Sequence, residues 1–104
     1  MTRESESPSD LDALRRNYRA ALLRYLPRRE EGPLHIGYEL GRHAVAQRVS
    51  MLELVRLHHD VLLEVLQTTS SEDLPEVAMA ASEFLLEALA TYDMTQRSSL
   101  DAPG

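Results

Sequence analysis

Hydrophobic residues recur every three or four positions through most of this 104-residue chain. In the first such segment they outline one face of a helix, made of Leu11, Leu14, Tyr18, Leu22 and Tyr25. Ser9 is placed to cap the start of this helix. Pro27 closes it, because the residue before a proline avoids the α conformation. This spacing therefore predicts a helix from Ser9 to about Leu26.

The same periodicity predicts a second helix over residues 33–48, a third over 51–66 and a fourth over 73–95. The third has the sharpest start, because Ser50 and Glu53 are spaced as a capping box. No segment alternates as a strand does, and no hairpin turn motif occurs. The sequence predicts an all-α, small four-helix domain over residues 9–97. Residues 1–8 are expected to be a disordered tail and residues 98–104 a frayed one.

Two glycines interrupt the second predicted helix, at Gly37 and Gly41. Each costs a helix interior roughly 1 kcal/mol relative to alanine. They lie one turn apart on the apolar face, beside the small residue Ala44, and the apolar periodicity continues through both. Missing side chains at this spacing allow a neighbouring helix to approach closely. The glycines are therefore interpreted as positions of close helix packing.

The third predicted helix is apolar almost all round. Its charged residues fall in one narrow stripe, made of Glu53, Arg56, Asp60 and Glu64. The opposite face is predicted to be the core face, and it contains Leu52, Val55, His59, Leu62 and Leu66.

The fourth predicted helix also carries more apolar surface than one core needs. Besides its main apolar face, this helix carries three apolar residues on the opposite side: Met79, Leu86 and Ala90. A helix that is apolar nearly all round is buried on two sides, and four short helices provide only one core. The sequence therefore predicts a homodimer, with Met79, Leu86 and Ala90 at its interface.

Composition narrows the classes of function. The formal net charge of −6 argues against nucleic acid as a partner. No apolar run approaches the length of a membrane span, and the polar, acidic N-terminus does not read as a secretory signal, so a cytoplasmic protein is expected. The absence of cysteine and lysine excludes thiolate and Schiff-base chemistry.

Histidine is the remaining candidate for chemistry, at positions 35, 43, 58 and 59. The Glu-x-x-His motif of di-iron bundles is absent, and no zinc-ligand spacing is present. No catalytic, cofactor-binding or metal site is predicted. The run from His59 to Leu62 faintly resembles the phosphoacceptor box of histidine-phosphotransfer bundles. Such a histidine must face solvent, whereas His59 is assigned to the core face.

Several segments together carry a family resemblance. They are YELGR (residues 38–42), SMLELVRLHHDVL (50–62), EFLLEALATYDMTQR (83–97) and the positions Tyr18, Leu22 and Leu26. Over about residues 10–97 the chain resembles the N-terminal regulatory domain of RsbU-type phosphatases. These are PPM-family serine phosphatases of stress-response partner-switching pathways.

The resemblance implies a dimeric four-helix domain of KaiA-like topology. It implies a non-catalytic module that receives a kinase-like switch protein of the RsbT type. That binding activates a phosphatase, which acts on an anti-sigma-factor antagonist and so frees a sigma factor. No phosphatase segment follows in the chain, which is therefore expected to be either a fragment or a stand-alone protein.

The partner-binding surface is expected on the side of the second helix away from the core, at Ile36, Glu39, Leu40 and His43. Apolar residues beside charges there suit a reversible contact, although the same residues could cover a dimer seam. Two alternative functions stay open at this point. One is histidine phosphotransfer, and the other is a generic helical dimerisation element with no switch partner.

Overall fold

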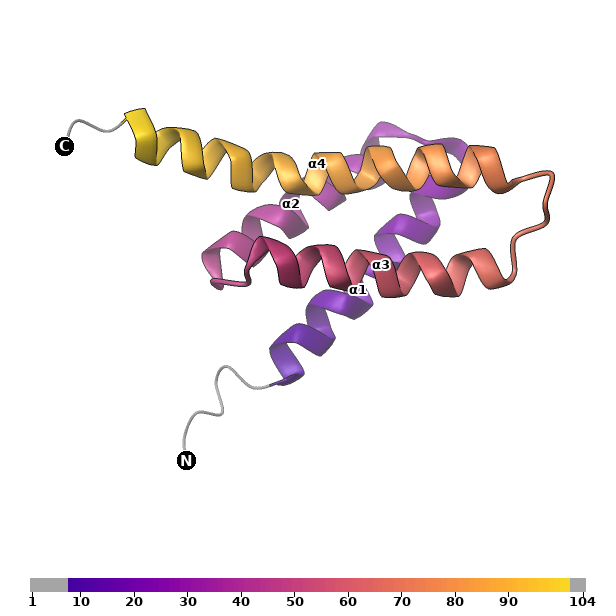
Figure 1. Cartoon of the computed structure of the whole chain (residues 1–104), viewed down its shortest axis with the longest axis horizontal. Helices are drawn as coiled ribbons and strands as arrows, with labels where there is room; N and C mark the ends of the chain where they lie inside the picture. The colour runs from indigo at the N-terminus through magenta and orange to yellow at the C-terminus, as the bar shows by residue number, and fades with distance from the viewer. Residues whose placement is uncertain (1–7, 102–104) are drawn as a thin grey trace.

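The computed structural model describes residues 8–101, and side chains from residue 11 to residue 94. It contains four helices: α1 (Pro8–Arg28), α2 (Glu31–Ala46), α3 (Met51–Gln67) and α4 (Leu74–Asp101). Helices α3 and α4 run side by side in opposite directions, and α1 and α2 lie behind them as a second layer (Figure 1). The predicted all-α four-helix domain is confirmed.

Helix α1 does not end before Pro27, as the sequence predicted, but includes that proline in its last turn. A proline there removes only one backbone hydrogen bond. The next turn still closes, because the amide of Arg29 donates to the carbonyl of Tyr25 over 2.7 Å. Leu26 packs against the core, which holds the residue before the proline in place. The helix ends at Arg28, and the next residue, Arg29, has a left-handed φ of 53°.

The predicted start of α3 is confirmed. The hydroxyl of Ser50 accepts from the amide of Glu53, and the Glu53 carboxylate accepts from the Ser50 amide, both over 3.0 Å. A reciprocal cap of this kind satisfies two backbone donors that the helix itself cannot pair. The boundary could be read from the sequence because the cap is local.

The far end of α4 differs from the prediction, because the helix continues to Asp101 instead of ending near Thr95. In Figure 1 its last turns extend past the ends of α2 and α3. The predicted tail over 1–8 falls almost wholly outside the described residues, as do residues 102–104 of the predicted tail over 98–104.

The core forms where the helices meet around two aromatic rings. Tyr18 of α1 and Phe84 of α4 are fully buried, and their rings pack edge to face with centroids 5.1 Å apart. Aliphatic residues complete this centre: Leu22, Leu54 and Val61. Burying each such side chain contributes roughly 1.5–3 kcal/mol. The core therefore joins α1, α3 and α4 around aromatic side chains.

Helices α2 and α4 make the most extensive helix–helix contact in the fold. Gly37 and Gly41 are both buried in it. A Cβ atom added at Gly37 would lie 2.8 Å from the Phe84 ring, and one at Gly41 would lie against the backbone of Ala88 and 2.8 Å from the Thr91 hydroxyl oxygen. The two backbones approach closely here because these positions have no side chains.

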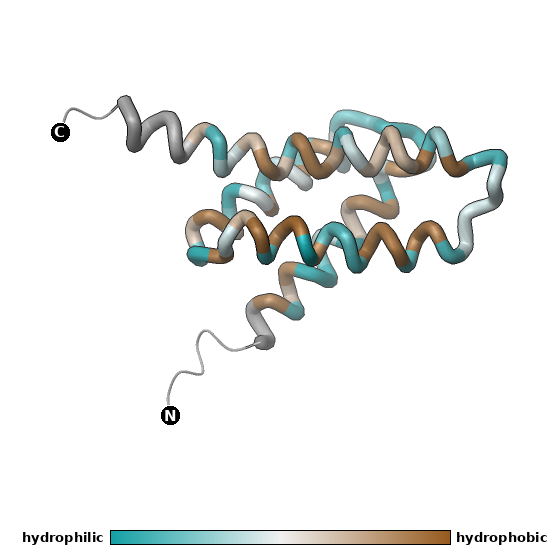
Figure 2. The backbone as a smooth tube through the Cα atoms, viewed as in Figure 1, coloured by the Kyte–Doolittle hydropathy of each residue, from teal (hydrophilic) through white to brown (hydrophobic). Residues whose placement is uncertain are grey.

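The predicted core face of α3 is wrong. The buried residues are Leu54, Leu57, His58 and Val61, whereas Leu52 and His59 are exposed. Both faces of the helix are apolar, so periodicity alone does not say which one turns inward. Figure 2 shows hydrophobic residues spread along most of α3 and α4.

Tertiary contacts decide the orientation of α3. They bring His58 to the Tyr18 hydroxyl, and Asp60 and Glu64 to arginines of α1. No helix in the described part of the chain is long and apolar enough to cross a membrane.

Candidate protein-interaction surfaces

The four residues predicted to bind a partner differ in how far their side chains are exposed to solvent. Ile36 is 38% exposed. Glu39 is engaged by its neighbours on α2, with His35 at 3.4 Å and Arg42 at 3.7 Å. Leu40 packs partly against the core, and together with the exposed His43 it lines a shallow hollow of about 130 Å³ against α1. The most open apolar group of this surface is therefore Ile36.

The residues predicted as a dimer interface lie on the outer side of α4. Leu86 is 66% exposed and Met79 is 56% exposed, while Ala90 is half-buried. Large apolar side chains at this exposure gain free energy when a partner removes them from water. Beside them, Leu86 and Glu87 border an open hollow of about 480 Å³ that reaches α1 and α2.

A third exposed apolar surface, on α3, was not recognised as a surface from the sequence. Leu52 is 63% exposed and Leu63 is 48% exposed, and His59 between them is also exposed. Val55, Leu62 and Leu66 are half-buried along the same side. The signal was present in the sequence, because the charged stripe is too narrow to cover everything outside the core face. This apolar side of α3 was predicted to be the core face instead.

The buried polar pair of the fold is Tyr18 with His58. The Tyr18 hydroxyl lies 2.6 Å from Nδ1 of His58, and it donates to this nitrogen when the imidazole is neutral with its proton on Nε2. Burial lowers the pKa of His58 to about 4, and the neighbouring His59 acts in the same direction. Burial raises the pKa of the Tyr18 hydroxyl. Both groups therefore stay neutral at pH 7 and join α1 to α3.

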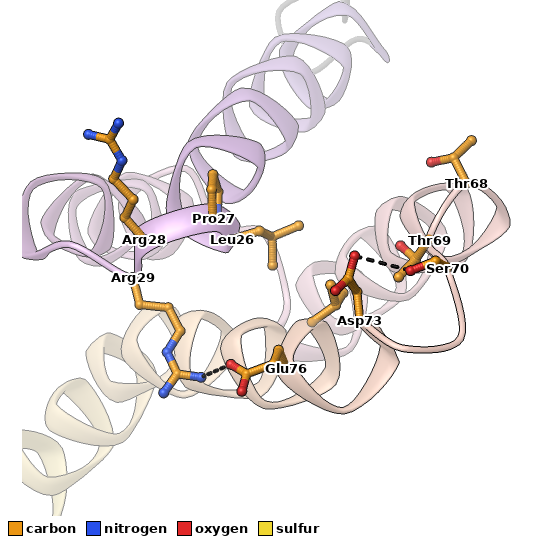
Figure 3. A pocket seen from close by; sticks show the side chains of 10 residues that line it. Leu26, Pro27, Arg28, Arg29, Thr68, Thr69, Ser70, Asp73 and Glu76 are labelled. Carbon is orange, nitrogen blue, oxygen red and sulfur yellow. Dashed lines mark hydrogen bonds and ion pairs between the residues drawn. The ribbon is translucent and has the colours of Figure 1, made fainter.

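A cleft of about 810 Å³ opens between the end of α1 and the connection from α3 to α4 (Figure 3). Leu26, Pro27 and Val77 contribute its apolar lining. The polar groups pair within the chain: Arg29 lies 3.6 Å from Glu76, and the Ser70 hydroxyl donates to Asp73 over 3.1 Å. This cleft was not predicted from the sequence, because α1 was predicted to end before Pro27.

The chemistry of these surfaces depends on which polar side chains the fold brings close together. Among the described residues, no three His, Asp or Glu side chains converge as a metal site requires. His58 is buried against a tyrosine, and His59 is exposed on the outer side of α3. The arrangement offers apolar surfaces bordered by charges, which is the chemistry of protein–protein contacts.

Comparison with known protein families identifies a relationship. The family model described as the N-terminal domain of the phosphoserine phosphatase RsbU matches residues 16–95. The matched span begins in α1, ends in α4 and takes up most of the chain. No curated protein and no solved structure matches it.

Proposed function

This chain belongs to the family of the N-terminal domain of the phosphoserine phosphatase RsbU, and on that premise we propose that it is a regulatory, non-catalytic protein-binding module. In this role it receives a switch protein of the RsbT type in a partner-switching pathway. The complex controls a PPM-family phosphatase and, through it, a stress sigma factor. A cytoplasmic location fits this role.

The observation that carries the proposal is the family match over all four helices. The exposed apolar residues support it independently. Leu52 of α3 and Leu86 of α4 each leave more than half of their surface in water, on a chain whose own core is already closed. Surfaces of this kind are stabilised by a partner. A binding module accounts for them without any catalytic group.

Two surfaces enter the proposal from the sequence. Ile36, Glu39, Leu40 and His43 of α2 are proposed to contact the switch protein. From the sequence, Met79, Leu86 and Ala90 of α4 are predicted to lie at the interface of a homodimer. These assignments are predictions, and the α2 surface rests mainly on Ile36 because Leu40 is partly covered by the core.

The test is isothermal titration calorimetry of the chain with a purified RsbT-type switch protein. We expect a complex with a Kd on the order of micromolar. Ile36→Glu should abolish it, because the substitution places a charge in the contact. Leu23→Glu on α1 is the matched control, since Leu23 is 39% exposed and Ile36 38%. Absence of binding by the unmodified chain would overturn the proposal, and equal loss in both variants would overturn the α2 surface.

Exposure of His59 is the observation that keeps histidine phosphotransfer as a second candidate. A phosphoacceptor histidine must be reachable by a kinase, and His59 meets that condition while buried His58 does not. Incubating the chain with a histidine kinase and labelled ATP separates the two functions. An acid-labile phosphate on His59 would favour phosphotransfer, and an unlabelled chain favours the binding module.

A further inference from the structure

The exposed side of α3 has the spacing of a helix–helix seam. Leu52, Val55, His59, Leu62 and Leu66 follow one another at intervals of three, four, three and four residues. This is the a/d repeat by which two helices pack along a shared apolar line. It borders the buried face of the same helix, which contains Leu54, Leu57 and Val61, and Leu62 also packs partly against the core. We call these five residues the outer seam.

We propose that the outer seam packs antiparallel against the outer seam of a second copy of this chain, with the two-fold axis close to His59. The inference rests on the homodimer of the proposed function and assigns its interface to α3 in place of α4.

The seam is symmetric about its centre, which is what a two-fold contact requires. His59 lies seven residues from Leu52 at one end and seven from Leu66 at the other. Antiparallel packing places the half with Leu52 and Val55 against the half with Leu62 and Leu66 of the second copy. Each half is apolar, so both ends of the contact bury leucine against aliphatic side chains. An isologous interface needs this self-complementarity.

The charges beside the outer seam also match their own two-fold image. Among the described side chains, Arg56 forms no ion pair. One and two turns further along lie Asp60 and Glu64. Both carboxylates are about half exposed although each is paired with an arginine of α1, and a carboxylate accepts more than one donor. Antiparallel packing brings Arg56 of each copy to these carboxylates of the other.

The outer side of α4 lacks this self-complementarity. Residues 74–96 contain no basic residue, and Glu76, Glu83 and Glu87 run beside Met79 and Leu86. Among the described side chains, Arg29 is the one that neutralises this row, at 3.6 Å from Glu76 and 3.6 Å from Glu83. A symmetric pair of α4 helices would bring two acidic rows together, and like charges across an interface are unfavourable. The charges therefore favour α3 as the seam between two copies.

The cysteine-free chain allows a direct test by cross-linking. His59→Cys places a single thiol next to the two-fold axis, and Leu86→Cys places one at the centre of the α4 surface. Under mild oxidation we expect a covalent dimer from His59→Cys and little from Leu86→Cys. Efficient cross-linking through Cys at 86 and not at 59 would overturn the inference while leaving the homodimer of the proposed function in place.

Sedimentation equilibrium provides the second measurement. Leu52→Glu with Leu66→Glu should raise the dimer Kd by at least about 100-fold, whereas Leu86→Glu should leave it within about threefold. Helicity by circular dichroism confirms that the variants fold. Arg56→Glu alone should weaken the dimer about tenfold, and adding Asp60→Arg should restore it. A dimer unaffected by the α3 variants overturns the assignment to α3, and a chain that is monomeric throughout overturns the homodimer as well.

Discussion

Helix α2 and helix α3 are held to the rest of the molecule in different ways. Helix α2 packs closely on α4, because its backbone lies against the Ala88 backbone at Gly41 and against the Phe84 ring at Gly37. Helix α3 is held through side chains, by the buried Tyr18–His58 hydrogen bond and by surface ion pairs such as Arg19–Glu64. A contact between backbones tolerates little change in shape. A contact through side chains leaves α3 free to present a second apolar face.

The largest expected effect comes from filling the α2–α4 contact. Gly41→Ala should destabilise the fold by roughly 2–3 kcal/mol, because the new methyl group meets the backbone of Ala88 and cannot be avoided by a side-chain movement. Gly32→Ala in the same helix is the matched control, since a Cβ atom there would meet nothing within 4 Å. Urea unfolding measures both, and equal stability of the two variants would contradict the close contact.

Low pH should weaken the packing of α3 against α1 more than the packing of the other helices. The pKa of His58 is lowered from about 6.5 to about 4 in the folded chain, so the unfolded chain binds the proton more readily between these values. Above about pH 6.5 this group therefore does not lower the free energy of unfolding. As the pH drops toward 4, the free energy of unfolding falls, by roughly 3 kcal/mol in total. Urea unfolding at several pH values follows this loss.

The control for this prediction is the neighbouring histidine. His58→Gln should remove this part of the acid dependence, whereas His59→Gln should keep most of it, because burial is the larger cause of the lowered pKa of His58 and His59 the smaller one. Amide hydrogen exchange at pH 4.5 should show α3 opening more readily than α2. Equal acid dependence in both variants would rule out His58 as its source.

The smallest expected effect concerns the ion pairs on the surface of α3. Arg19 lies 3.2 Å from Glu64, and both side chains are about half exposed. Solvent screens such pairs, so Arg19→Ala should cost only about 0.2–1 kcal/mol, and less in high salt. A shift of the urea midpoint as large as that of Gly41→Ala would contradict the screening of this exposed ion pair.

Features that depend on neighbouring residues could be predicted from the sequence. The capping box of Ser50 and Glu53, the number of helices and the glycine positions in α2 could all be read from local spacing, because caps and apolar periodicity act within a few residues. The family resemblance could also be read from the chain, and the family match confirms it.

The end of α1 could not be predicted in the same way. Pro27 is a local signal for helix termination. The helix continues past it because Leu26 packs against the core and the Arg29 amide donates a hydrogen bond to the Tyr25 carbonyl. Tertiary packing here outweighs a local preference that rests on one missing hydrogen bond. Pro27 and Arg28, by which α1 exceeds its predicted end, line part of the cleft shown in Figure 3.

What the sequence determined by itself is that α3 is apolar on two sides. Which side turns inward was decided only in the folded molecule, where the Tyr18 hydroxyl requires a buried partner and finds His58. An unpaired buried hydroxyl costs roughly 1–3 kcal/mol, whereas apolar side chains gain similar free energy on either face. Long-range polar pairing therefore selected between two faces that hydrophobic periodicity could not distinguish, and it left Leu52 and His59 outside.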